Sequence, residues 1–229
     1  MSRFCQKKLK DRANAKYDPA GLHRCYHNEG HDGVCREFPY LEHFEQVAPK
    51  VRQKIIRDAT KTTGASWKSD DAGPNRISRW TMLLPDDQLK KLGVDMAALK
   101  PWVVAKLREK AATYEDCMDA ARKLTWLAYG MAHAPAPDGV TKQYLERLFG
   151  PIVTGSTTCL ICKAQLSFED FAQARRGRAE IETAHASPRA HSSANIGFAH
   201  RHCNIAQGDK SLDQFYEWIK GILQRAGRL

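Results

Sequence analysis

Two Cys/His pairs with the same internal spacing constrain the last third of this 229-residue chain more than any other feature. The first pair is Cys159-x-x-Cys162 and the second is His200-x-x-Cys203. Two thiolates at this spacing bind one tetrahedral Zn²⁺, and a site closed to chemistry needs two further ligands. The second pair supplies them, so the sequence predicts a structural zinc ion that joins the two segments.

His202 is the competing choice for the fourth ligand, but it adjoins Cys203. Adjacent residues rarely both reach one small ion, so we assign the position to His200. The alternative is that the pairs are unrelated buried cysteines, which the matched spacing disfavours. A unit of about 80 residues with few large apolar side chains gains stability from such a metal staple.

Composition and pattern divide the chain into three regions, 1–40, 41–150 and 151–229. The first is rich in Cys, His and Gly, the second has apolar residues at helical spacing, and the third carries the zinc pairs. The stretch HAPAPDG at 133–139 is typical of a linker and marks the second boundary. We therefore expect an α+β protein, with a small zinc module, a mainly helical region and a zinc-stapled domain.

The middle region has recognisable helix limits. Apolar residues at helical spacing over 40–64 predict a helix that ends at Gly64. A later helical stretch is expected to be interrupted near Pro101.

The third region predicts strand, strand and helix around the zinc ligands. Residues 179–187 alternate imperfectly between apolar and polar, as in a short strand, and 195–209 begin extended and turn helical after Cys203. Residues 211–223 place their apolar side chains on one helical face.

The charge of the chain favours a polyanionic partner. The formal net charge is +10, with a pI of 9.3, and the basic residues are spread along the sequence. Double-stranded DNA is the partner that this excess suggests, although a solvated basic surface alone would give the same count. No apolar run is long enough to span a membrane. The N-terminus lacks the apolar segment of a secretory signal, so we expect a cytoplasmic protein.

The residues around the zinc pairs resemble a known family. After Cys159-x-x-Cys162 come His185-x-x-Pro188, then Asn195, then His200-x-x-Cys203-Asn204 and Gln-Gly-Asp at 207–209. This order over about residues 150–225 resembles the HNH endonucleases of the ββα-metal type. The resemblance implies a ββα-metal nuclease domain that hydrolyses phosphodiester bonds with one catalytic Mg²⁺ or Mn²⁺.

The chemistry assigns a role to each remaining residue. A neutral imidazole takes a proton from water at physiological pH, so His185 is the expected general base. A hard divalent ion would stabilise the scissile phosphate and the leaving oxygen. By resemblance, Asn204 is one ligand of that ion, and Asn195 braces the loop between the strands and orients His185.

One position departs from the family pattern. Family members place an acid just before the histidine, where this chain has Ala184. Glu182 lies two residues earlier and points the same way on a strand, so we expect it to be the acidic metal ligand. His191 and Asp209 are the fallback ligands. His191 is otherwise expected in a solvent-exposed loop.

The N-terminal stretch holds a second group of metal-binding residue types. Cys5, Cys25, His31 and Cys35 predict a second zinc site, in which His23 or His27 could replace a member. Free thiols without a metal are the alternative.

The leading hypothesis is a restriction-type DNA endonuclease in which 41–150 recognises DNA and 151–229 cuts it. Such an enzyme is bacterial or phage-encoded by resemblance, and one active site per chain predicts a homodimer for cutting both strands. A homing or phage HNH endonuclease is the nearest alternative. A non-catalytic zinc-stabilised DNA-binding protein is the alternative from another class.

Overall fold

The computed structural model describes residues 5, 7, 9, 24–26, 30, 35–62, 77–91, 95–173 and 179–229. The predicted ligand His31, its substitutes His23 and His27, and the predicted helix end at Gly64 lie outside the described residues.

Within the described residues the protein is α+β and mostly helical, with one two-stranded sheet. Short 3-10 turns occur at Pro39–Leu41, Arg79–Leu83 and Met96–Ala98. The helices and strands are α1 (Glu42–Val47), α2 (Pro49–Thr60), α3 (Asp86–Lys91), α4 (Pro101–Glu109), α5 (Tyr114–Tyr129), α6 (Gly139–Phe149), α7 (Phe168–Ala172), β1 (Ile181–His185), β2 (Ile196–His200), α8 (Arg201–Gln207) and α9 (Leu212–Arg225). No helix of this described part is long and apolar enough to cross a membrane.

Two prolines begin helices where the sequence pattern predicted a continuous helix or an interruption. The stretch 40–64 forms two helices, α1 and α2, and Pro49 is the first residue of the second. Proline lacks the N–H that a first helical position does not need, and its fixed φ suits that position. Pro101 likewise starts α4. α2 ends at Thr60, before the predicted end at Gly64.

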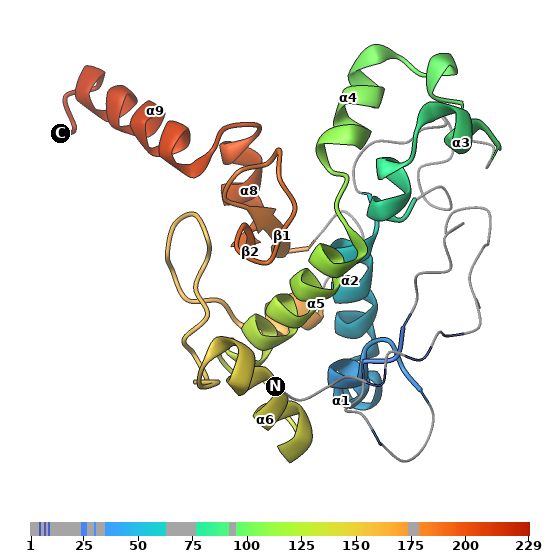
Figure 1. Cartoon of the computed structure of the whole chain (residues 1–229). Helices are drawn as coiled ribbons and strands as arrows, with labels where there is room; N and C mark the ends of the chain where they lie inside the picture. The colour runs from blue at the N-terminus through green and yellow to red at the C-terminus, as the bar shows by residue number, and fades with distance from the viewer. Residues whose placement is uncertain are drawn as a thin grey trace.

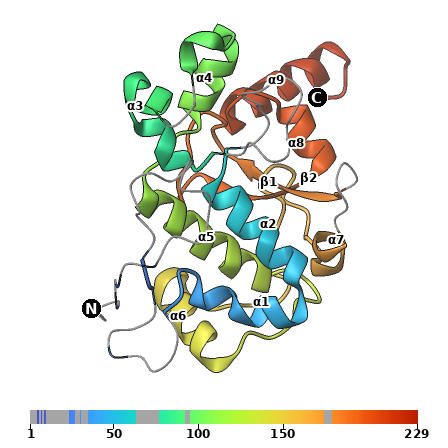
Figure 2. The same cartoon turned by 90° about the vertical axis from the view of Figure 1, so that its right-hand side faces the viewer.

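Helix α5 lies at the centre of the molecule and packs against both α2 and β2 (Figures 1 and 2). Its N-terminus is capped by Thr113, whose hydroxyl oxygen accepts the N–H of Asp116 at 3.1 Å. Ala120, Ala121 and Ala128 are fully buried, and their small side chains allow neighbouring elements to approach closely. α5 therefore joins the helical region to the hairpin.

The two strands form an antiparallel hairpin that continues directly into α8. Ile181 pairs with His200, and His185 pairs with Ile196. The helix begins at Arg201 rather than after Cys203 as predicted, so Cys203 lies within its first turn. This places the end of β2 and the start of α8 beside the turn that carries Cys159 and Cys162.

One continuous core joins residues from all three predicted regions, from Tyr26 to Phe215. A smaller separate core lies between α3 and α4, at one edge of the molecule (Figure 1). Helix α9 extends away from the body and buries Phe215 near its start (Figure 1). The division at 40 and 150 into separate folding units stays a prediction.

Candidate functional site

The four side chains predicted to bind zinc lie together beside the hairpin. The Sγ atoms of Cys159, Cys162 and Cys203 and a ring nitrogen of His200 all lie within 4.8 Å of one another. Cys162 Sγ is 3.4 Å from His200 Nδ1. Ligand atoms around a tetrahedral Zn²⁺ lie about 3.3–3.8 Å apart, given bonds of about 2.0–2.3 Å. The cluster could hold a metal ion, and its donor set is one that Zn²⁺ favours.

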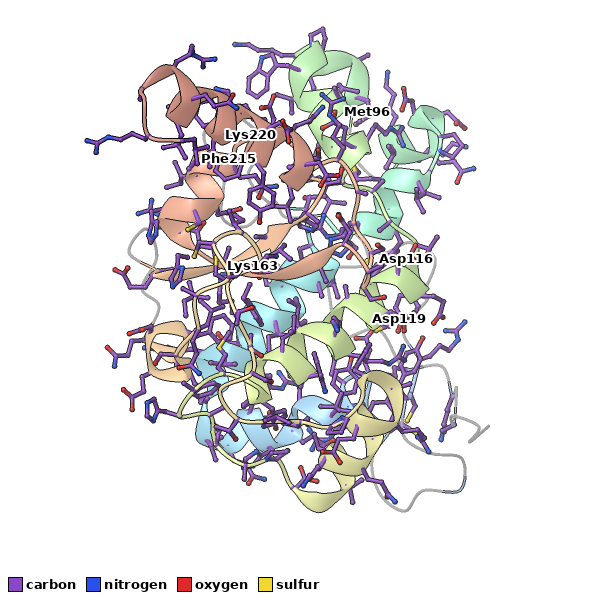
Figure 3. All side chains as sticks on the ribbon, turned by 90° about the vertical axis from the view of Figure 1, so that its left-hand side faces the viewer. Met96, Asp116, Asp119, Lys163, Phe215 and Lys220 are labelled. Atoms are coloured by element: carbon purple, nitrogen blue, oxygen red, sulfur yellow. The ribbon has the colours of Figure 1, made fainter. Side chains whose placement is uncertain are left out.

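The turn that carries the first two cysteines packs directly on β2. Lys163 adopts a left-handed conformation with φ 63°, and its N–H donates to the carbonyl oxygen of Cys159 at 3.0 Å. The N–H of Leu160 donates to the carbonyl oxygen of Phe198 in β2 at 2.8 Å. Figure 3 shows Lys163 in front of the hairpin. These local bonds hold both thiols on the side of the hairpin where β2 ends.

Backbone donors favour the thiolate form of Cys159. Burial raises the pKa of this thiol, but N–H groups of Cys162, His200 and Ile161 donate to the sulfur and bring its pKa below the ordinary value. His202 is exposed and lies outside the cluster, with its ring stacked on His200 at 5.2 Å between centroids. The position of His202 thus agrees with the choice of His200 as the fourth ligand.

Glu182 and Asn204 meet on the hairpin face that α8 covers. Asn204 Nδ2 donates to Glu182 Oε2 at 3.1 Å, and Arg201 Nε lies 3.3 Å from Glu182 Oε1. A half-turn of the Asn204 amide exchanges its oxygen and nitrogen. The same contact can then present two oxygens to a hard cation, which usually takes one or two protein ligands plus water and phosphate.

His185, the last residue of β1, has the opposite parity to Glu182, so its side chain leaves the other face of the strand. That face meets the end of α2, where Thr183 Oγ1 donates to Asp58 Oδ2 at 2.9 Å. His185 Nε2 lies 3.0 Å from His191 Nδ1, and His191 Nε2 lies 2.8 Å from the carbonyl oxygen of Ala59. The hairpin is therefore docked on α2 by two side-chain contacts.

The surroundings of His185 and His191 keep both rings neutral. Burial lowers the pKa of His185 to about 3, helped by Arg79 and Lys110 and opposed by Asp58. Burial also lowers the pKa of His191 to about 2, again with Arg79 contributing. A neutral imidazole has one ring nitrogen free to accept a proton, and phosphate charge near His185 would raise its pKa.

Two residues that shape this site were named in the sequence analysis without the contacts that they make in the structure. His191 was expected in an exposed loop, but it is 6% exposed, and both of its ring nitrogens are engaged. Gln207, the last residue of α8, is buried, and its Nε2 donates to the carbonyl oxygens of His185 and Lys210, each at 2.9 Å. The Gln-Gly-Asp sequence signalled Gln207, whereas no local pattern indicated that His191 is buried against α2.

Asn195 binds the loop between the strands through its side chain. Its Oδ1 accepts the N–H of Ser187 at 2.7 Å, and its Nδ2 donates to the carbonyl oxygens of Ser187 and Ala190 at 2.8 and 2.6 Å. All three contacts are to backbone atoms. This residue can therefore fix the loop that carries His191 without contacting a reacting group.

The two residues predicted as fallback metal ligands, His191 and Asp209, lie in different surroundings. Both ring nitrogens of His191 are already in hydrogen bonds. The side chain of Asp209 is 89% exposed, with Lys210 Nζ 4.0 Å away. Glu182 keeps the stronger claim because it is the carboxylate that meets Asn204.

Three of the four N-terminal cysteines and histidines predicted as ligands lie together. The Sγ atoms of Cys5, Cys25 and Cys35 are within 4.8 Å of one another, and Cys5 Sγ is 3.8 Å from Cys35 Sγ. The segment is attached to α5, since the Tyr26 hydroxyl donates to the carboxylate of Glu115 at 3.0 Å. This group could also hold a metal ion.

Comparisons with known proteins agree with a nuclease. The DraIII family model matches residues 37–203. A crystal structure of a type II restriction endonuclease is 44% identical in sequence, covers 99% of each chain and has a TM-score of 0.84. No curated protein matches the chain.

Proposed function

The chain belongs to the DraIII family of restriction endonucleases, and from this premise we propose that it is a type II restriction enzyme that cuts double-stranded DNA through a ββα-metal site. The restriction role is favoured over a homing or phage role because the similar solved structure is a type II restriction endonuclease.

The observation that carries the proposal is the grouping of three sets of residues on one hairpin and the helix after it. The Cys/His cluster lies at the junction of β2 and α8. Asn204 follows the last cluster ligand and contacts Glu182 across to β1. His185 ends the same strand, and Gln207 of α8 bonds to its carbonyl oxygen.

The chain's own residues divide the work of phosphodiester hydrolysis. His185 takes a proton from the attacking water, which its neutral ring is free to do. Glu182 and Asn204 hold a divalent cation, Mg²⁺ or Mn²⁺, which when bound supplies positive charge at the phosphate and the leaving oxygen. In this proposal the scissile phosphate binds at the end of the hairpin, between the face that carries Glu182 and the face that carries His185.

The zinc ion has a structural role in this proposal. Cys159, Cys162, His200 and Cys203 hold it, and it fixes the start of α8 so that Asn204 stays opposite Glu182. All four positions are filled by protein ligands, which leaves no open site for chemistry.

One observation favours the alternative that the protein binds DNA without cutting it, and the experiment below tests this alternative as well. Arg201 forms an ion pair with Glu182. Its guanidinium gives that carboxylate the positive charge that a metal cation would otherwise provide. If this pair persists on DNA, the protein binds without cutting.

The decisive experiment uses supercoiled plasmid with Mg²⁺. We expect the wild-type chain to nick or linearise it and His185→Ala to lose cleavage by about 10²-fold or more while still binding DNA, because a general base contributes that much. Glu182→Gln should raise the Mg²⁺ concentration needed for half-maximal cleavage by about 10-fold or more, since even outer-shell partners of a metal contribute that much to affinity.

Two matched control variants test whether the effects are specific to His185 and Glu182. His133→Asn changes an exposed histidine at φ 61°, a conformation that asparagine tolerates, and should cut normally. Glu180→Gln changes an exposed acid just before β1 and should leave the Mg²⁺ requirement unchanged. Binding without nicking by the wild-type chain would support the non-catalytic alternative.

A further inference from the structure

Two imidazoles in series link the proposed base to the end of α2. The carbonyl oxygen of Ala59 can only accept, so the hydrogen in its 2.8 Å contact belongs to Nε2 of His191. A neutral imidazole carries one N–H, which leaves Nδ1 of His191 as an acceptor. The hydrogen in the 3.0 Å contact between the rings therefore belongs to Nε2 of His185. In the neutral ring of His185, Nδ1 then keeps the free lone pair.

The neutral state of His191 is secured by its position. The side chain is 6% exposed. Its neighbours Arg79 and Lys110 disfavour a further positive charge. An acceptor at Nδ1 is thus available to His185 across the working pH range.

We propose that His191 is a positioning residue that holds His185 in the Nε2–H tautomer, so that Nδ1 of His185 is the atom that takes the proton from water. The inference rests on the proposed function of His185 as general base and adds the residue that sets its tautomer and orientation.

The reaction step balances with this arrangement. The water proton moves to Nδ1 of His185 while the water oxygen forms a bond to phosphorus. The bond from phosphorus to the 3′ oxygen breaks, its electron pair stays on that oxygen, and the oxygen takes a proton from solvent. His185 is left as an imidazolium with its Nε2–H still directed at His191, and it later releases the Nδ1 proton to solvent.

Helix geometry explains why the carbonyl oxygen of Ala59 is available to His191. Ala59 lies in the last turn of α2, where carbonyl oxygens have no partner within the helix. His191 supplies the missing donor. The partial negative charge at a helix C-terminus also favours positive charge nearby, which helps when His185 becomes protonated.

The charged groups around the pair act in both directions. Asp58 on α2 favours an imidazolium at His185, whereas Arg79 in its 3-10 turn and Lys110 after α4 oppose it. The hydrogen bond to His191 fixes which nitrogen is protonated whatever the balance of these charges.

The competing explanation is that His191 only clips the hairpin to α2. Thr183 provides a comparison, because its bond to Asp58 joins the same two elements without touching His185. Thr183→Val removes that clip with little change of shape. A purely structural role predicts the same behaviour for the Thr183 and His191 variants.

The first measurement is the tautomer itself, by ¹⁵N NMR of the full chain labelled at histidine, without DNA, at pH 7. We expect His185, assigned by its loss in His185→Gln, to show a protonated Nε2 and an unprotonated Nδ1. A protonated Nδ1 in the wild-type chain would overturn the proposal even if the protein is an active nuclease.

The second measurement is single-turnover cleavage with Mg²⁺. His191→Phe keeps the ring shape and removes both hydrogen bonds, and we expect it to cut at least about 10²-fold more slowly, the lower end of a base's contribution. His191→Asn keeps an acceptor near the place of Nδ1 and should recover most of the rate. Thr183→Val should stay within about threefold of wild type, well below the loss expected when a base is removed.

The two proposals fail in different ways. Normal cleavage by His185→Ala removes the base assignment itself. Loss of cleavage in His185→Ala, together with normal cleavage in His191→Phe, leaves the base in place and overturns the positioning role. Should His191→Phe fail to fold, the wild-type tautomer and His191→Asn still decide the matter, because an Asn variant with the rate of a base-free enzyme contradicts the proposal.

Discussion

Ala184 stands where the HNH endonucleases that the sequence resembles have an acid, and strand geometry offers another acid on the same face. The side chains of residues 182 and 184 leave the same face of β1, and Glu182 is the acid on that face. It reaches Asn204 on α8. The acid that the sequence pattern lacked at one position is therefore available two residues earlier.

The burial of His191 predicts how the free energy of unfolding depends on pH. Its pKa in the folded protein is about 2, below the ordinary 6.5, because the ring is buried. Unfolding therefore takes up a proton below pH 6.5, and the stability that neutral His191 contributes is present above 6.5 and falls as the pH drops toward 2. We expect the free energy of unfolding to fall more steeply from pH 6.5 to 5 in the wild type than in His191→Phe. The difference should be on the order of 1 kcal/mol per pH unit.

Urea unfolding at several pH values measures this slope, and the zinc thiolates contribute equally to both proteins. His133→Asn is the matched control, since an exposed histidine should leave the slope unchanged. Equal slopes for wild type and His191→Phe would mean that His191 titrates normally in the folded chain.

At the scale of elements, the four side chains that could hold a metal ion come from two chain segments and from three structural elements. Cys159 and Cys162 lie in a turn, His200 ends β2, and Cys203 lies in the first turn of α8. The two strands have five residues each, and a hairpin of this size is marginal by itself. In the proposal, a metal ion at these ligands adds to the packing of the hairpin on α5 by fixing the junction of β2 and α8.

This arrangement predicts the metal content of the purified protein. We expect two zinc ions per chain by elemental analysis, one after Cys162→Ser and one after Cys35→Ser, because each substitution removes one ligand of one cluster. Cys162→Ser should also abolish cleavage and lower the melting temperature, since the start of α8 loses its anchor.

Cys117→Ala is the control for this experiment, because Cys117 is buried on α5 and belongs to neither metal group. It should keep two ions. One ion in the wild type that survives Cys162→Ser, or none at all, would contradict the assignment of the C-terminal cluster.

At the scale of the whole molecule, the proposed function and the net charge together predict that the affinity for DNA depends on salt. A net charge of +10 is spread along the chain, so many phosphates can be contacted at once. Neutralising six or more phosphates makes affinity fall about 10³-fold or more between 50 and 200 mM salt. We expect a drop of this size for random DNA in fluorescence anisotropy with Ca²⁺ in place of Mg²⁺. An affinity that does not change with salt would contradict binding through contacts to the phosphates.

The oligomeric state that the proposed function requires is a further prediction about the whole molecule. One proposed active site per chain requires two copies for a double-strand cut, so the chain should sediment as a dimer when bound to a cleavage site. A monomer that only nicks DNA would contradict the type II proposal.

The continuous core explains why the predicted regions are hard to separate in the folded protein. α5 packs on α2 and on β2, so the helical region and the hairpin share buried surface. The linker at 133–139 is a break in secondary structure between α5 and α6. Residues 133–138 lie outside regular helices, and Gly139 begins α6.

The sequence by itself determined the features that depend on near neighbours along the chain. Ligand pairs with two residues between them and a strand that includes His185 follow from local geometry, and they were predicted without a structure. The helix was predicted to start after Cys203 and starts at Arg201. The first residues of α2 and α4 also have local causes, because proline suits a helix start, yet periodicity alone missed them.

Only the tertiary structure decided what surrounds the proposed base. His191 is buried because α2, 132 residues earlier, offers an unpaired carbonyl at its end. The contact of Thr183 with Asp58 spans 125 residues in the same way. Periodicity and spacing report which residues share a face, whereas burial and hydrogen-bond partners depend on which distant element covers that face.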